Sequence, residues 1–181
     1  MSKTILKLLG WRVHIEPILN IKKSVIIAAP HTSNWDFIIG ILAAKACKIR
    51  VKFIIKKEWN LPIIGLILRF FGAIFVNRSK AQGVTASIID TIKAMPEGHI
   101  VFTPEGTRSP VQKWRSGFYH IAYNSHTPIS VGYLNYTEKV IGIDHILYPS
   151  GNIASDCDVL RHFYKDIPSK HPENYISNWG I

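Results

Sequence analysis

The sequence has no uninterrupted apolar run long enough to cross a lipid bilayer. Residues 61–76 come closest, but Pro62, Gly65, Arg69 and Gly72 interrupt them. A membrane-spanning helix needs about 20 consecutive, predominantly apolar residues. We therefore expect no transmembrane helix.

Cysteine and acidic residues are both scarce. Neither Cys47 nor Cys157 has neighbours at metal-ligand spacing, and no secretory signal precedes them, which favours a reduced, cytoplasmic protein. The 12 acidic residues are outnumbered by 22 lysines and arginines spread along the chain, for a formal net charge of +10. Such a charge suits an anionic partner, whether nucleic acid, acidic lipid or a phosphorylated substrate. No nucleic-acid motif is present, and the aromatic residues lie within apolar runs, so we expect no nucleic-acid partner.

Several catalytic and cofactor motifs are also missing. Without a Gly-x-Ser-x-Gly sequence, a serine hydrolase is not favoured. A Walker loop and a dinucleotide-binding glycine run are absent. The eight histidines include no His-x3-His pair with a third ligand, so we expect no metal site.

What the sequence does contain is an alternation of short apolar runs and helical patterns. The apolar runs predict strands at residues 25–29, 51–55, 73–76, 99–102, 128–134 and 139–147. Helices are predicted at residues 1–12, 36–47, 62–71, 80–95, 117–124 and 155–164. This order indicates an α/β fold: one domain over residues 1–181, with a mostly parallel central sheet flanked by helices.

A histidine and a carboxylate, His31 and Asp36, lie where the first strand gives way to a helix. On an unbroken helix, side chains five residues apart point about 140° away from each other. If the chain turns after Pro30 and the helix begins near Asn34, Asp36 can accept a hydrogen bond from one ring nitrogen of His31. The other nitrogen is then free to act as a base. The alternative is that Asp36 only caps the helix and His31 is an ordinary loop histidine.

Two further polar clusters follow predicted strands, Asn77-Arg78 and the stretch from Glu105 to Ser109. If the strands are parallel, these clusters and His31 converge at one edge of the sheet. Gly106 permits backbone angles that turn amides toward an anion, and Thr107, Arg108 and Ser109 add hydroxyls and a guanidinium. Glu105 does not fit a pure phosphate site, so we expect it to hold an arginine or to accept from a substrate hydroxyl. The alternative is a surface turn with a weak Glu–Arg pair.

Together these blocks resemble the glycerolipid acyltransferase family, of the 1-acylglycerol-3-phosphate acyltransferase type. The His-x4-Asp block is His31 to Asp36, the Gly-x-Ile-Phe-x-x-Arg block is Gly72 to Arg78, and the Pro-Glu-Gly-Thr-Arg-Ser block is Pro104 to Ser109. Thr127-Pro128-Ile129 opens a late strand, as in the family. The resemblance covers residues 25–135.

The resemblance implies an O-acyltransferase in which His31 is the general base and Asp36 orients its imidazole. The donor is an acyl thioester, on coenzyme A or acyl carrier protein, and the acceptor is the hydroxyl of a lysophospholipid-type molecule. Neither a metal nor a further cofactor is implied. The family pattern assigns acceptor binding to a polar set made of Asn77, Arg78, Glu105, Gly106, Thr107, Arg108 and Ser109.

The sequence departs from the family in three ways. Thr103 stands where an aromatic residue usually precedes Pro-Glu-Gly, and Asn77 replaces a common aspartate. Both changes bear on the identity of the acceptor rather than on the reaction type. The long hydrophobic N-terminal segment of many members is missing, which favours a peripheral enzyme at the cytoplasmic face of a membrane.

Membrane contact has its own basis in the sequence. Within residues 1–20, an amphipathic helix places Ile5, Leu8 and Leu9 on one face, and Trp11 is a ring type common at membrane interfaces. This segment could also pack on the body of the protein. The apolar residues 61–76 and the charge of +10 favour an anionic membrane surface. A non-catalytic anion-binding or membrane-binding module that uses the same arginines is the alternative to an enzyme.

Overall fold

The computed structural model describes residues 1–76 and 81–181. The strands are β1 (Arg12–His14), β2 (Lys23–Ala29), β3 (Val51–Lys56), β4 (Ala73–Val76), β5 (Gly98–Phe102), β6 (Ile129–Asn135) and β7 (Val140–Leu147). The α-helices are α1 (Ser2–Leu8), α2 (Asn34–Ala46), α3 (Pro62–Phe70), α4 (Ala81–Ala94), α5 (Gly117–Ser125) and α6 (Ile153–Tyr164). Every strand and helix predicted from the sequence is present, and the α/β class is confirmed.

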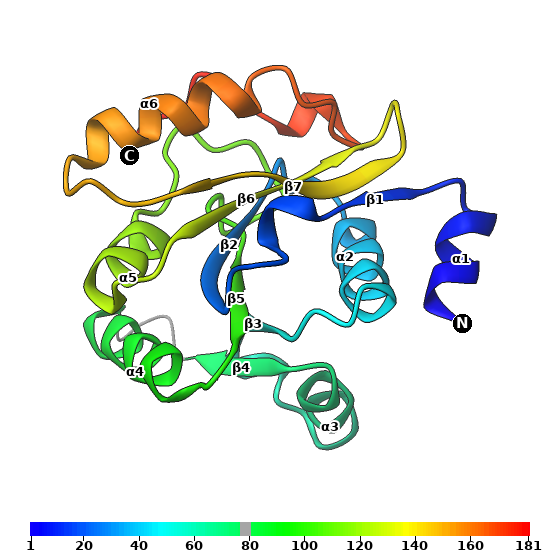
Figure 1. The fold of residues 1–181 in the computed structure, drawn as a ribbon, viewed down its shortest axis with the longest axis horizontal. Helices are drawn as coiled ribbons and strands as arrows, with labels where there is room; N and C mark the ends of the chain where they lie inside the picture. Colours follow the sequence, from blue (N-terminus) through cyan, green and yellow to red (C-terminus); the bar gives the residue numbers. More distant parts are fainter. Residues whose placement is uncertain (77–80) are drawn as a thin grey trace.

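The strands form one sheet in the order β1-β7-β6-β2-β5-β3-β4 (Figure 1). β2 pairs in parallel with β5 and β6, and β3 pairs in parallel with β4 and β5. Only the β6–β7 pairing is antiparallel among the described strands. The carboxyl ends of β2 to β6 therefore share one edge of the sheet, as expected from the sequence.

β2 is buried on both faces, which explains its continuous apolar run. Val25 and Ile27 are fully buried against α4, α5 and α6, in a cluster that includes Ile92 and Phe118. Ile26 points to the opposite face, where α1 and α2 lie (Figure 1). A strand buried on both sides has no polar face, so its sequence does not alternate.

The N-terminal segment differs from the prediction. α1 ends at Leu8, and Gly10, with φ of 79°, turns the chain into β1, which pairs with β7. Trp11 is only 8% exposed and packs edge-on against Tyr136, with ring centroids 5.1 Å apart. Of the two alternatives left open by the sequence, Trp11 therefore packs on the body of the protein rather than at a membrane interface. In the part of the chain that the structure describes, no helix is long and apolar enough to span a membrane.

A buried polar chain crosses the middle of the sheet. Ser130 on β6 donates to the Ser24 hydroxyl on β2 at 2.7 Å, and Ser24 contacts Nδ1 of His99 on β5 at 2.8 Å. Burial lowers the pKa of His99 from 6.5 to about 4, because the charged imidazolium is costly in an apolar interior. His99 is therefore neutral at physiological pH and hydrogen-bonds with the Ser24 hydroxyl.

This arrangement predicts acid sensitivity. The unfolded chain takes up a proton at His99 below pH 6.5, whereas the folded chain does so only near pH 4. Stability from neutral His99 is thus complete above pH 6.5 and is lost as the pH falls toward 4, by about 3 kcal/mol. Denaturant unfolding of the wild type should show this extra loss relative to His99→Asn, and equal losses in both proteins would contradict the assignment.

Candidate active site

The site begins with the way in which α2 starts. Ser33 is the N-cap, and its Oγ accepts a hydrogen bond from the Trp35 amide at 3.2 Å. Asp36 accepts in return from the Ser33 amide at 2.9 Å. This reciprocal capping box fixes the first helical residue at Asn34. His31 consequently lies in the turn before the helix, where its side chain can fold back toward Asp36.

His31 and Asp36 are in contact, as the sequence predicts for a helix that begins at Asn34. Nδ1 of His31 lies 3.0 Å from Oδ2 of Asp36. An ionised carboxylate only accepts hydrogen bonds, so Nδ1 carries the proton and Nε2 retains its lone pair. The His31 side chain is 17% exposed, which leaves the ring partly open to the surface. Asp36 thus both caps the helix and orients the imidazole.

Asp36 is ionised although it is buried. Burial alone would raise its pKa, but the hydrogen bonds from His31, Tyr136 and the Ser33 amide outweigh that effect and lower the pKa. The Tyr136 hydroxyl donates to Oδ1 at 2.5 Å, and the Thr32 amide donates to Oδ2 at 3.0 Å. Both carboxylate oxygens therefore have donors, which is the condition for keeping a charge in the interior.

Glu105 lies on the other side of His31, after the end of β5. Its Oε1 accepts a hydrogen bond from the His31 amide at 3.0 Å, and the residue is only 6% exposed. Among the described residues this carboxyl pairs with no arginine and holds the backbone of the His31 turn, while Arg78 lies outside the described residues. Oε2 is buried, and no partner for it occurs among the described residues. Burial raises the pKa of Glu105 to about 7, so the group titrates near neutrality.

Gly106 is half-buried, and the following Thr107, Arg108 and Ser109 are exposed beside the same turn. Gly106 has φ of 68°, and a Cβ there would lie 2.7 Å from Nε of Arg115, so this position requires glycine. Arg108 donates to the side-chain oxygen of Asn34 at the start of α2. Thr107 Oγ1 accepts from the Ser109 amide at 3.3 Å.

The structure brings together most, but not all, of the predicted site residues. His31, Asp36, Glu105 and Arg108 are joined through hydrogen bonds between the two loops. The other predicted cluster, Asn77 and Arg78, lies outside the described residues. Its place in the site therefore remains a prediction from the sequence.

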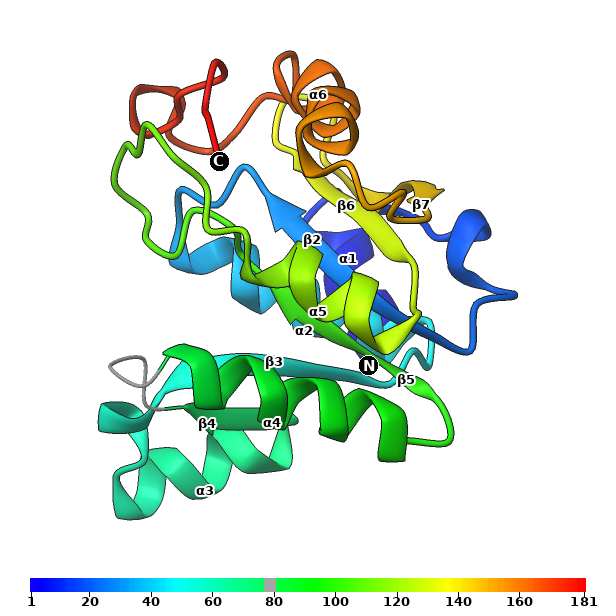
Figure 2. The same cartoon turned by 90° about the vertical axis from the view of Figure 1, so that its left-hand side faces the viewer.

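The C-terminal tail, residues 165–181, also reaches this edge, and no sequence signal indicated it. The Thr32 hydroxyl accepts from the His171 amide at 3.2 Å, and the Lys170 ammonium lies 5.1 Å from the centre of the Trp35 ring. Figure 2 shows the end of the tail and the loop after β5 on the same side of the molecule. These contacts join residues more than 100 positions apart, so no local pattern could reveal them.

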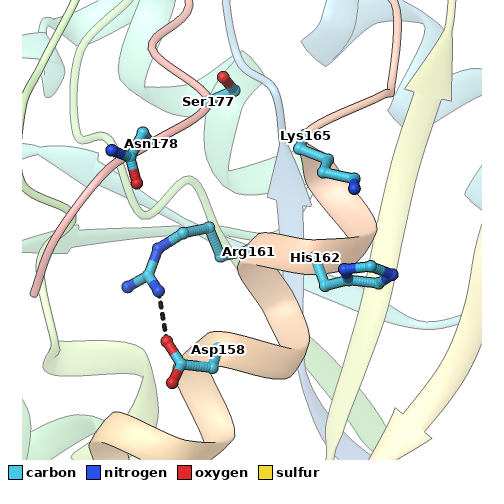
Figure 3. Close-up of a pocket in the computed structure, with 6 residues that line it drawn as sticks. All are labelled: Asp158, Arg161, His162, Lys165, Ser177 and Asn178. Atoms are coloured by element: carbon cyan, nitrogen blue, oxygen red, sulfur yellow. Dashed lines mark hydrogen bonds and ion pairs between the residues drawn. The ribbon is translucent and has the colours of Figure 1, made fainter.

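Two hollows in the surface lie apart from His31. One separates α6 from the tail and is lined by Asp158, Arg161, His162, Lys165, Ser177 and Asn178 (Figure 3). There Arg161 pairs with Asp158, and its Nε donates to the Trp179 carbonyl at 2.8 Å, which fastens the tail to α6. The other hollow lies at the amino edge of the sheet, beside Lys22, Arg50 and His99. The candidate site is the His31 turn rather than either hollow, because the turn contains the contact between His31 and Asp36.

The state of Glu105 gives a test of this geometry. Its pKa is about 7 in the folded chain and 4.5 in the ordinary case, so stability from the protonated form is complete below pH 4.5 and lost as the pH rises through 7. Glu105→Gln keeps the acceptor for the His31 amide and does not ionise. Between pH 4.5 and 8, wild type should lose about 3 kcal/mol of unfolding free energy relative to the variant.

Chemical denaturation at several pH values measures this difference. Glu97→Gln, at an exposed ion pair with Arg50, controls for the loss of one negative charge. A constant difference between wild type and Glu105→Gln across this pH range would show that Glu105 does not titrate as proposed.

The chain is 30% identical over 164 residues to a 1-acyl-sn-glycerol-3-phosphate acyltransferase of Borreliella burgdorferi, an alignment covering 83% of this chain and 63% of that protein. It is 32% identical over 103 residues to a lyso-ornithine lipid O-acyltransferase of Rhizobium meliloti, covering 56% of this chain and 34% of that protein. A probable 1-acyl-sn-glycerol-3-phosphate acyltransferase of Mycoplasma pneumoniae is 29% identical over 114 residues, which cover 60% of this chain and 43% of that protein.

The chain thus spans less than two thirds of the length of each of these three relatives. A family model described as Acyltransferase matches residues 11–131, which include the His31 turn, Glu105 and Arg108. Because that match covers more than half of the sequence, the chain belongs to the Acyltransferase family.

Proposed function

We propose that this protein transfers an acyl group from an acyl thioester to the hydroxyl of a lysophospholipid-type acceptor, with His31 as the general base. The observation that carries the proposal is the contact of 3.0 Å between His31 Nδ1 and Asp36 Oδ2 at the polar edge of the sheet. The family match and the names of the relatives support the reaction class. The donor carrier is coenzyme A or acyl carrier protein, with no metal or further cofactor.

In the proposed reaction, Nε2 of His31 takes the proton of the acceptor hydroxyl as its oxygen attacks the thioester carbonyl. A carbon–oxygen bond forms, and the carbon–sulfur bond then breaks. The imidazolium returns the proton to the departing thiolate, so the thiol and the acyl ester leave and His31 is neutral again. Asp36 stabilises the transient imidazolium across its hydrogen bond with Nδ1.

The acceptor head is proposed to bind on the side of His31 that faces the loop after β5. Arg108 is exposed and next to the start of α2, where a guanidinium can pair with an anionic headgroup. The proposed set of acceptor-binding residues is completed by Asn77, Arg78, Gly106, Thr107 and Ser109. Glu105 belongs to it as the buried carboxyl that holds the backbone of the His31 turn. Two of the relatives are named for 1-acyl-sn-glycerol-3-phosphate and the third for lyso-ornithine lipid. We therefore propose lysolipids as the acceptor class and not one particular lysolipid.

The apolar face of α3 is proposed to contact the membrane that holds such lipids. Ile63, Leu66, Ile67 and Phe70 follow helical spacing and are 75%, 68%, 51% and 81% exposed. A helix of a soluble domain normally buries such a stripe. In Figure 2, α3 lies at the lower left of the molecule and the loop after β5 at the upper left. The proposal for α3 therefore rests on its exposed apolar residues.

Charge favours an anionic membrane for this face. Lys45 lies over the Phe71 ring at 4.1 Å, Arg69 belongs to α3 itself, and Lys56 and Lys57 lie at the end of β3 and the start of the connection that leads to α3. Apolar contact combined with basic residues is typical of proteins that bind the interface of acidic membranes. We propose the cytoplasmic face, in keeping with the reduced cysteines expected from the sequence.

A non-catalytic anion-binding or membrane-binding module is the competing function. It would use the exposed arginine but would not need the His31–Asp36 pair. Headgroup binding that survives His31→Ala, together with no thioester turnover by wild type, would favour it.

His31→Ala tests the proposed base directly. Release of free thiol from acyl-CoA, measured against a panel of lysolipid and hydroxy-lipid acceptors, should fall about 10² to 10⁴-fold because a positioned base is lost. The circular dichroism spectrum should stay unchanged, since the ring is partly exposed. His162→Ala, at an exposed histidine on α6, is the matched control and should keep wild-type activity. Full activity in His31→Ala would remove the base assignment.

Vesicle flotation tests the membrane face. Ile63→Asp and Phe70→Asp should each weaken binding to anionic vesicles about tenfold. Each variant replaces an apolar contact with a negative charge, which the anionic lipid headgroups repel. Val159→Asp, at an exposed apolar residue on α6, is the matched control. Binding by wild type should also decrease as salt rises. Equal binding to neutral and anionic vesicles at any salt would count against the electrostatic part.

A further inference from the structure

Oδ1 of Asp36, the carboxylate oxygen that does not contact His31, accepts a hydrogen bond from a tyrosine that follows strand β6. Tyr136 follows the last residue of β6, which pairs with β2 on the side opposite to β5. Its hydroxyl donates to Asp36 Oδ1 at 2.5 Å. This residue lies beyond the matched family region, which ends at residue 131.

The tyrosine is itself fixed in place. Its ring meets Trp11 edge-on, with centroids 5.1 Å apart, and its amide donates to the Pro168 carbonyl of the tail at 3.0 Å. Contacts from two other parts of the chain thus hold the ring and backbone, and the hydroxyl has a defined position. A donor held in this way can define the orientation of its acceptor.

We infer that Tyr136 is a positioning residue that locks the Asp36 carboxylate in the orientation that holds His31 in the Nδ1–H tautomer. With Oδ2 shared by His31 and two amides, and Oδ1 bound by the hydroxyl, rotation of the carboxylate would break hydrogen bonds on both sides. The inference deepens the proposed function and rests on it, since the tautomer matters for a base at Nε2.

The hydrogen bond from the Tyr136 hydroxyl also stabilises the negative charge of Asp36. The raised pKa of Tyr136, caused by burial and by this hydrogen bond, means that the phenol stays protonated and remains a donor. Without the donor, the carboxylate would attract the proton on Nδ1 more strongly but would be less well oriented. Removal of the hydroxyl should therefore change both the rate and its dependence on pH.

Tyr136→Phe keeps the ring against Trp11 and removes only the hydroxyl. We expect kcat for thiol release to fall about tenfold, in line with the loss of one hydrogen bond to a charged group. KM for both substrates should stay within about twofold, because the hydroxyl does not face them. The acid limb of the pH–rate profile should move to higher pH. A purely structural role would lower the melting temperature without moving that limb.

Tyr133→Phe is the matched control. Tyr133 lies three residues earlier on β6, and its hydroxyl contacts His14 Nδ1 at 3.3 Å, away from Asp36. This variant should keep the wild-type rate and pH profile. Wild-type kcat together with an unmoved acid limb in Tyr136→Phe would overturn the inference.

Nitrogen NMR of protein labelled at its eight histidines provides a readout that does not depend on turnover. His31→Gln identifies the His31 signals. In wild type they should report one Nδ1–H tautomer, and in Tyr136→Phe a mixture of the two. Lack of thiol release by wild type would remove the proposed function, whereas His31 signals that are identical in both proteins would remove the role of Tyr136.

Discussion

One buried carboxylate holds the candidate site together. Asp36 accepts hydrogen bonds from the His31 ring, from the amides of Thr32 and Ser33, and from the Tyr136 hydroxyl. A buried charge is tolerated only when it is fully hydrogen-bonded, so the turn, the start of α2 and the end of β6 are all required to keep it there. The same bonds that stabilise the charge also orient the imidazole, which makes helix capping and side-chain positioning a single feature of the fold.

The order of the strands explains why these groups meet. β2 lies between β5 and β6, so the loop that carries His31 has a neighbour from each adjacent strand: Glu105 on one side and Tyr136 on the other. The two carboxyl groups beside His31 nevertheless have pKa values that are shifted in opposite directions. Hydrogen bonds lower the pKa of Asp36, whereas burial raises that of Glu105 to about 7. The histidine therefore has a charged partner at its ring and, at its backbone, a carboxyl group that titrates near pH 7.

Much of this could be predicted from the sequence, because it depends on local patterns. The apolar runs defined the strands, and parallel pairing then required the His31 turn and the Glu105 loop to share an edge. The short N-terminal strand, by contrast, has only three residues and is formed by pairing with β7, so no periodicity marked it. The partner of Glu105 is a backbone amide, which has no sequence signature, and Tyr136 acts across 100 positions. The sequence left open whether Trp11 faces a membrane or packs on the protein, because its burial depends on that same distant tyrosine.

The tail contributes more than its weak sequence pattern suggests. Trp179 stacks on Trp114 with centroids 3.6 Å apart and planes within 6°, and both rings are almost completely buried. Trp114 belongs to the connection between β5 and α5, so the last residues of the chain close the core beneath the loop that carries Arg108. The folding unit accordingly extends well past the region matched by the family model, which ends at residue 131. A chimera that replaces the connection between β5 and α5 of this chain would need to keep Trp114, because otherwise the Trp179 ring would lose the aromatic face on which it stacks.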